Sequence, residues 1–129
     1  IGIFLTCSES IGCTGDAPYI CHGYLGRHLL DELGFPPEYG LVSERHTGAG
    51  ITKENIISNK LPLPARDMVP ISIEEKLICM ADKYHSKSPH KSGNILTTAQ
   101  VIEELATEIN QEHAQRFSDW MDELGTRIK

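Results

Sequence analysis

Apolar residues recur every three or four positions along most of the chain, and this spacing is typical of amphipathic helices. Between Asp16, a favourable N-cap, and the "GFPP" segment, the pattern predicts a helix over about 17–33. The second proline of "GFPP" suits a first helical position and opens a predicted helix over about 37–47. Thr52 is placed to cap a short helix over Lys53–Ser58.

The second half of the chain continues this helical pattern after a break. The stretch "LPLPARDMVP" holds three prolines and predicts an extended loop. An S-x-x-E capping box at Ser72 opens a predicted helix that runs to about Tyr84. A T-x-x-Q box at Thr97 opens the last pattern, which predicts one long helix, or two with a bend near Asn110, up to Gly125. No stretch alternates with period two, so the sequence predicts an all-α fold, as a single domain over 1–129.

Composition narrows the classes of function. The formal net charge of -6 argues against a nucleic-acid-binding surface as the main function. No apolar run approaches the roughly 18–20 residues that span a bilayer, and we therefore expect a cytoplasmic protein without nucleic-acid or membrane partners. The four cysteines lack C-x-x-C spacing, so we expect reduced, mostly packed thiols. A zinc or redox function of these cysteines is the alternative, but it has no supporting motif.

Three polar residues on three predicted helices are candidates for chemistry. His22, His46 and Asp82 together supply two imidazoles and one carboxylate, a set that divalent transition metals favour. Each residue also has a structural interpretation. His22 begins an H-x-x-x-G pattern, in which Gly26 would let another backbone approach. A histidine at a helix end gains from the helix dipole, and a mid-helix aspartate needs a partner when buried. The spacing alone does not bring the three together.

The glycine turn "HTGAG" that follows His46 has two interpretations. It could cradle a phosphate, but such loops normally follow a strand and lead into a helix, whereas a helix precedes this one. We therefore expect a helix-ending turn with positive φ at a glycine. Of the other histidines, His28 and His113 are predicted at the surface. His85 and His90 lie in or beside a polar loop, where they could contact a substrate.

Two long stretches then suggest a family. The run "HGYLGRHLLDELGFPPEYGLVSERHTGAGITKEN", followed by "LPLPARDMVPISIEEKLICMADKYHS", resembles the HD-superfamily proteins of the HDIG type. The resemblance covers about residues 16–86. It implies a helical, metal-dependent phosphohydrolase that cleaves a phosphoester, such as a nucleotide, by metal-activated water.

The resemblance assigns roles by position. His22, His46 and Asp82 match metal ligands of that family, for one or two divalent ions whose identity the sequence does not distinguish. The His-Asp doublet of the family is absent, and Ile1 and Gly2 match the two residues that follow it, so we expect the chain to lack the first ligands and the N-terminal helices. Other catalytic residues are not identified. Four cations are candidates for phosphate contacts: Arg45, Lys76, Lys83 and Lys87.

The expected partner is thus a small phosphorylated substrate. The alternative is a non-catalytic helical module that binds a small molecule or partner and carries a degenerate metal site. For the chain by itself we predict weak or no metal binding, and also self-association, because a core without its first helices would expose apolar surface.

Overall fold

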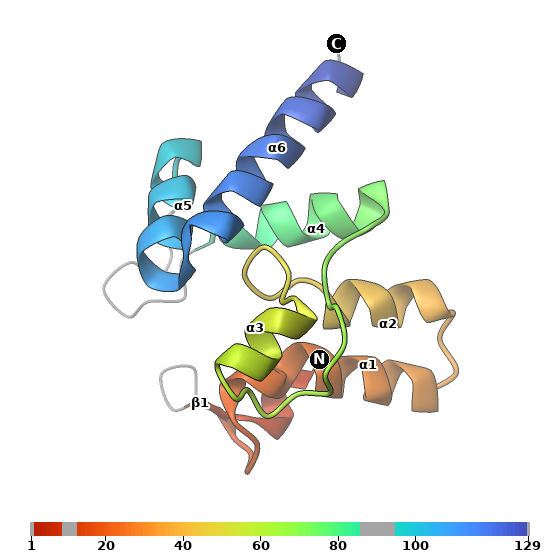
Figure 1. The fold of residues 1–129 in the computed structure, drawn as a ribbon. Helices are drawn as coiled ribbons and strands as arrows, with labels where there is room; N and C mark the ends of the chain where they lie inside the picture. Colours follow the sequence, from red (N-terminus) through yellow and green to blue (C-terminus); the bar gives the residue numbers. More distant parts are fainter. Residues whose placement is uncertain (1, 9–12, 86–94, 129) are drawn as a thin grey trace.

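The computed structural model describes residues 2–8, 13–85 and 95–128, which are mostly helical and confirm the predicted all-α class (Figure 1). A small antiparallel pair, β1 (Cys7–Ser8) with β2 (Cys13–Thr14), is the one sheet among these residues. No helix in the described ranges is long and apolar enough to cross a membrane.

The first helices begin and end differently from the prediction. A 3₁₀ turn, η1 (Gly2–Leu5), precedes the β pair, and a second, η3 (Tyr19–Cys21), leads into α1 (His22–Glu32). Pro18, rather than Asp16, is the N-cap of η3. Helix α2 (Pro37–Glu44) begins at the predicted proline but ends before His46. His46 therefore lies in the turn after the helix, not on it.

Helices α1 and α2 lie side by side as an antiparallel pair (Figure 1). A Cβ added at Gly26 would lie 2.4 Å from the Ser43 hydroxyl oxygen and 3.1 Å from the Gly2 nitrogen. The Ser43 hydroxyl also donates a hydrogen bond of 3.0 Å to the Gly23 carbonyl across the helix pair. The structure thus confirms that the H-x-x-x-G pattern permits a close backbone approach.

In the middle of the chain, the helices begin where their capping residues predict. Helix α3 (Lys53–Ser58) has the range that the sequence predicts, with a complete capping box at Thr52. The proline-rich loop returns along the turn after α2, where Ile51 and Met68 form an isolated antiparallel bridge. Helix α4 (Ile73–Lys83) then begins after Ser72, whose side chain accepts a hydrogen bond from the Glu75 amide.

The C-terminal pattern divides into two helices, as the second predicted alternative has it. Helix α5 (Thr98–Glu104) continues into a single π-helical segment, η4 (Leu105–Ile109). Asn110 is extended, with φ of -170° and ψ of 172°, and α6 (Gln111–Ile128) follows in a new direction. The predicted bend near Asn110 is confirmed, whereas the π-helical segment was not predicted.

The main core lies where α4, α5 and α6 meet. Phe117 and Cys79 are fully buried there, and Val101 and Trp120 pack with them. The described free cysteines are exposed at Cys7 and buried at Cys21 and Cys79, so most of these thiols are packed, as predicted.

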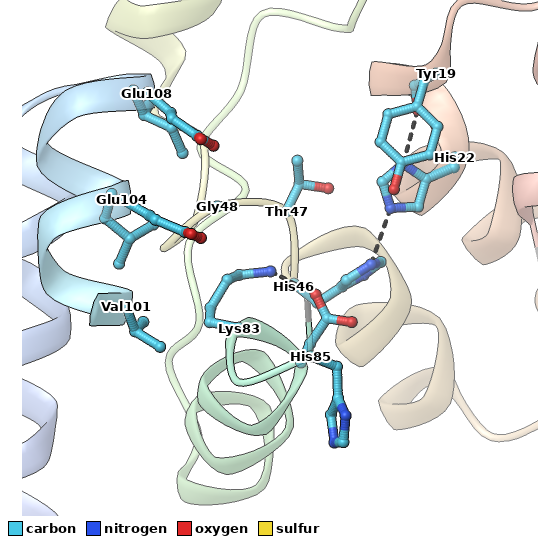
Figure 2. A pocket seen from close by; sticks show the side chains of 13 residues that line it. Tyr19, His22, His46, Thr47, Gly48, Lys83, His85, Val101, Glu104 and Glu108 are labelled. Carbon is cyan, nitrogen blue, oxygen red and sulfur yellow. Dashed lines mark hydrogen bonds and ion pairs between the residues drawn. The ribbon is translucent and has the colours of Figure 1, made fainter. Parts of the chain in front are cut away.

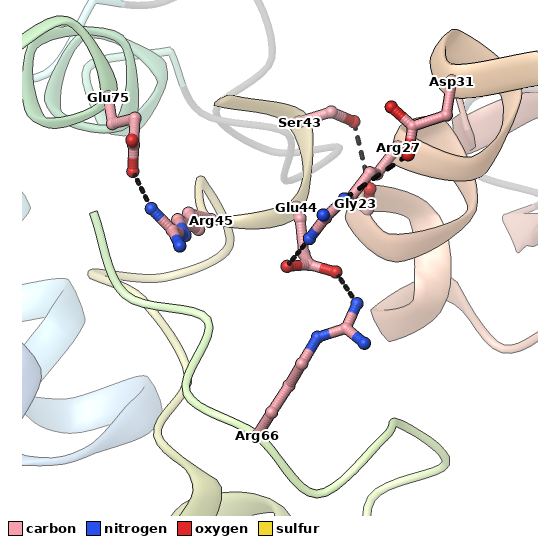
Figure 3. A network of polar contacts seen from close by, with 8 residues as sticks. All are labelled: Gly23, Arg27, Asp31, Ser43, Glu44, Arg45, Arg66 and Glu75. Carbon is pink, nitrogen blue, oxygen red and sulfur yellow. Dashed lines mark hydrogen bonds and ion pairs between the residues drawn. The ribbon is translucent and has the colours of Figure 1, made fainter. Parts of the chain in front are cut away.

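A buried carboxylate joins α1, α2 and the proline-rich loop. The Glu44 side chain is only 1% exposed and forms an ion pair of 2.8 Å with Arg27 from α1. Its other oxygen accepts from Arg66 of the proline-rich loop (Figure 3). This network fixes the end of α2, and with it the turn that carries His46.

Candidate functional site

A pocket of about 400 Å³ opens between the start of α1, the turn after α2, the end of α4 and the α5–η4 segment (Figure 2). This volume lies in the range of small-ligand sites, roughly 300–1,000 Å³. All three residues that the sequence selected, His22, His46 and Asp82, line it. The other lining residues are Tyr19, Thr47, Gly48, Lys83, His85, Val101, Glu104, Leu105, Glu108 and Ile109.

The two histidines meet through their outer ring nitrogens. The Nε2 atoms of His22 and His46 lie 2.9 Å apart, and the rings pack edge to face with centroids 4.8 Å apart. The Nδ1 atoms contact backbone carbonyl oxygens, at 2.7 Å for His22 with Tyr19 and 2.6 Å for His46 with Ser43. Both rings are therefore oriented by a backbone carbonyl three residues earlier in the chain.

These contacts determine where the ring protons lie. A carbonyl oxygen only accepts, so each Nδ1 must carry a proton, and a neutral ring then presents a lone pair at Nε2. The Nε2–Nε2 contact is a hydrogen bond only when one ring carries both of its protons. One further proton taken up by the pair would lie between the two Nε2 atoms.

The His46 ring is difficult to protonate. Burial lowers its pKa to about 4, although the Ser43 carbonyl and the Asp82 carboxylate act in the opposite direction. At neutral pH the His46 ring is therefore uncharged and its Nε2 is an acceptor. The ring can take part in hydrogen bonding or proton transfer without a permanent charge.

The glycine turn after His46 is packed against the Cys79 thiol. Gly48 and Gly50 have φ of 58° and 88°, which confirms the predicted positive φ, although α2 has already ended at Glu44. The Cys79 thiol contacts the carbonyl oxygens of His46 and Gly48 at 3.4 and 3.3 Å. Burial raises the pKa of this thiol to about 11, so it is a packed, protonated donor.

Helix α6 supports the same turn, and here the prediction for His113 was wrong. His113 is 3% exposed rather than at the surface, and its Nδ1 accepts from the Ala49 amide at 3.0 Å. Arg116 donates to the carbonyl oxygens of Ala49 and Gly50 at 2.7 and 3.1 Å. Sequence reasoning missed these roles because a polar residue on a helix does not reveal a distant backbone partner.

Asp82 reaches the pocket beside its neighbour in sequence. Its Oδ2 atom lies 2.5 Å from the Lys83 ammonium group. Among the residues that the structure describes, no group of three or more His, Cys, Asp or Glu side chains could hold a metal ion. The metal-binding assignment that followed from the family resemblance is thus not supported, although the pocket does gather the three residues; the divalent-ion cofactor itself stays a prediction.

The predicted phosphate-binding cations do not gather. Lys83 lines the pocket, but Arg45 forms an ion pair of 2.8 Å with Glu75 (Figure 3), and Lys76 forms one of 2.8 Å with Glu123. Lys87 lies outside the described residues, as does His90; His85 lines the pocket, as its position near the loop suggested.

The sequence analysis missed the wall opposite the histidines. Glu104 and Glu108 extend from α5 and η4, and their carboxylates are directed into the pocket (Figure 2). Their spacing of four residues places them on one side of a helix, which is a detectable signal. Nothing in the sequence indicated that this side would face His22 and His46.

Comparison with known proteins indicates a different class of protein from the one that the resemblance implied. No family model and no solved structure matches the chain. It is 32% identical over 107 residues, 83% of its length, to the tRNA (cytidine(56)-2'-O)-methyltransferase of Picrophilus torridus, of which the match covers 29%. The enzyme of the same name from Thermoplasma volcanium is 36% identical over 63 residues, 49% of this chain and 18% of that protein. An uncharacterized protein of Methanocaldococcus jannaschii is 51% identical over 61 residues, 47% of this chain and 35% of that protein.

The chain therefore spans about a third or less of the length of these curated relatives. Their names overturn the assignment to the HD phosphohydrolases, and with it the hydrolase function and the alternative of a degenerate binding module. They also contradict the expectation of a small phosphorylated substrate and no nucleic acid, since the named substrate is tRNA. The physical reason for the error is that the resemblance rested on residues that shape helices and turns, and a fold does not define a reaction.

Proposed function

We propose that this chain acts in tRNA modification, as part of a protein that methylates a ribose 2'-hydroxyl of tRNA. The observation that carries the proposal is the 32% identity to a tRNA methyltransferase over 83% of the chain. The second relative of the same name supports it over a shorter stretch. The proposal also implies that the protein works in the cytoplasm, where such a substrate would be met.

The described residues do not fit a methyl donor. Nucleotide-like cofactors are commonly bound at the carboxyl edge of a parallel sheet, next to a glycine-rich turn that opens a helix. In ranges 2–8, 13–85 and 95–128 the single sheet is a short antiparallel pair. We therefore derive no methyl-transfer step from these residues and assign them to contacts with the RNA.

The pocket that His22 and His46 line is suited to such a contact. It is large enough for a small polar group and combines hydrogen-bonding side chains with an aromatic one. Tyr19 stacks on His22 with ring centroids 4.5 Å apart and planes inclined by 28°. Unstacked RNA bases bind to aromatic side chains and to groups that read their polar edges.

The charge of the chain predicts how it would bind. With a formal net charge of -6 it would neutralise few phosphates, so its affinity for tRNA should fall only weakly with added salt. Recognition would then depend on the bases rather than on the backbone.

Two measurements test the proposal. Mass spectrometry of tRNA from cells in which the gene is disrupted should show the loss of a 2'-O-methylated nucleoside. Filter binding of the purified 129-residue chain to a tRNA transcript, at several salt concentrations, should show saturable binding. Unchanged tRNA methylation together with no binding to tRNA would overturn the proposal.

A further inference from the structure

A second polar surface lies outside the pocket, where the proline-rich loop packs against the start of α1. The Cys21 thiol contacts the Pro62 carbonyl oxygen at 3.4 Å, which holds the loop to the helix. Two residues later the Arg66 amide donates a hydrogen bond of 2.8 Å to the Pro64 carbonyl, which closes a tight turn. These contacts fix the backbone from which the Arg66 side chain extends.

The Arg66 side chain is itself held by an aromatic ring and a carboxylate. Its Cζ atom lies over the Tyr24 ring, 5.6 Å from the ring centroid, within the range of a cation–π contact. Its guanidinium group also donates to the Glu44 carboxylate (Figure 3). The Glu44 side chain is 1% exposed, whereas that of Arg66 is 46% exposed. Arg66 is thus both fixed and accessible, and it would lose little conformational freedom when a ligand binds.

The charges around Arg66 disfavour a phosphate as its ligand. Glu44 also pairs with Arg27 at 2.8 Å, and Arg27 lies 3.6 Å from Asp31. Two carboxylates therefore balance the two guanidinium groups, so an added phosphate would gain little net attraction. The planar shape of the Arg66 guanidinium group does not depend on this balance. Such planes stack on flat π systems, and unpaired RNA bases bind to proteins in this way.

His28 adds an exposed imidazole to the same surface. It lies one helical turn after Tyr24 on α1, and the two rings meet edge to face with centroids 4.6 Å apart and planes inclined by 88°. Arg66 from the loop and His28 from the helix therefore both contact Tyr24. An imidazole can donate or accept a hydrogen bond, so it can contact the edge of a flat ligand whichever polar groups that edge carries.

We infer that Arg66 stacks on one unpaired base of the RNA, through the part of its guanidinium group that Tyr24 and Glu44 leave exposed. Every base has a flat π face, so this contact would hold the RNA without selecting one nucleotide. It needs no net positive charge, which fits a chain with a formal net charge of -6. The inference rests on the proposed function, because it names a further part of the chain that touches the RNA.

The test compares a single-stranded RNA of mixed sequence with an abasic oligonucleotide of the same length, which has the phosphates but no bases. By fluorescence anisotropy, the wild-type 129-residue chain should bind the RNA at least about tenfold more tightly than the abasic oligonucleotide. Arg66→Lys keeps the charge but removes the plane, and should weaken RNA binding about tenfold. Lys53→Gln removes a charge from an exposed position on α3 and should bind the RNA as the wild type does.

A measurement on the wild-type protein guards against a variant that fails to fold. A base stacked on Arg66 should move the NMR signal of its Nε–H group upfield through the ring current, and the abasic oligonucleotide should not. An unmoved signal with bound RNA, or RNA binding by Arg66→Lys as tight as that of the wild type, would rule the inference out. If tRNA still binds in that case, the proposed function stands without it; if no RNA binds at all, both fail.

Discussion

The buried His113 predicts a loss of stability in mild acid. Burial lowers its pKa to about 4, and the positive charge of Arg116 acts in the same direction, against an ordinary value of 6.5. The unfolded chain therefore binds more protons than the folded protein between these two pH values. The stabilisation is fully present above pH 6.5 and is lost as the pH falls toward 4.

The magnitude follows from the two pKa values. Between pH 7 and pH 5, one such histidine reduces the free energy of unfolding by about 2 kcal/mol. His46, whose pKa is also lowered to about 4, contributes in the same direction, so the protein should lose about 4 kcal/mol in total. That is a large share of the roughly 5–15 kcal/mol by which domains are stable.

The assay is urea denaturation followed by the fluorescence of Trp120, the single, buried tryptophan. His113→Asn keeps an acceptor for the Ala49 amide but cannot titrate, so its loss between pH 7 and pH 5 should be about half that of the wild type. His28→Asn, at an exposed position, should keep the full wild-type loss. An equal pH dependence of wild type and His113→Asn would refute the reasoning.

Two further predictions concern the supports of the pocket, and a third concerns metal binding. Glu44→Gln should lower the free energy of unfolding by about 2 kcal/mol, because it leaves two arginines without their buried counter-charge, whereas Glu38→Gln at the surface should change it little. Gly50→Ala should cost more than Gly34→Ala in thermal denaturation: both have positive φ, but only at Gly50 would the new Cβ meet backbone, 2.7 Å away. Calorimetric titration of the chain with Mn²⁺ or Fe²⁺ should show weak or no binding, and a tight isotherm would contradict the absence of a three-ligand group among the described residues.

The helices could be predicted where their signals are local. Thr52 and Thr97 cap helices through their own side chains, within four residues of sequence, and both helices begin where the capping motif places them. The end of α2 could not be predicted in the same way. It stops at Glu44, whose carboxylate pairs with arginines from two other segments, and such tertiary contacts leave no local pattern.

The candidate site was likewise predictable only in part from the sequence. That His22, His46 and Asp82 share one pocket agrees with their selection from the sequence, but the selection relied on residue type and not on position in space. The carboxylates come from Glu104 at the end of α5 and from Glu108 in the π-helical segment, both beyond the stretches on which the resemblance rested. The negative charge of these carboxylates makes the pocket less suited to phosphate and more suited to a ligand that donates hydrogen bonds.

The negative charge of the pocket also bears on the RNA contact that we propose for this acidic chain. Binding through phosphates requires clustered cations, and here Arg45 and Lys76 are paired with Glu75 and Glu123 away from the pocket. An acidic pocket repels phosphate, so the contact with RNA that we propose for this chain would rest on the bases rather than on the backbone.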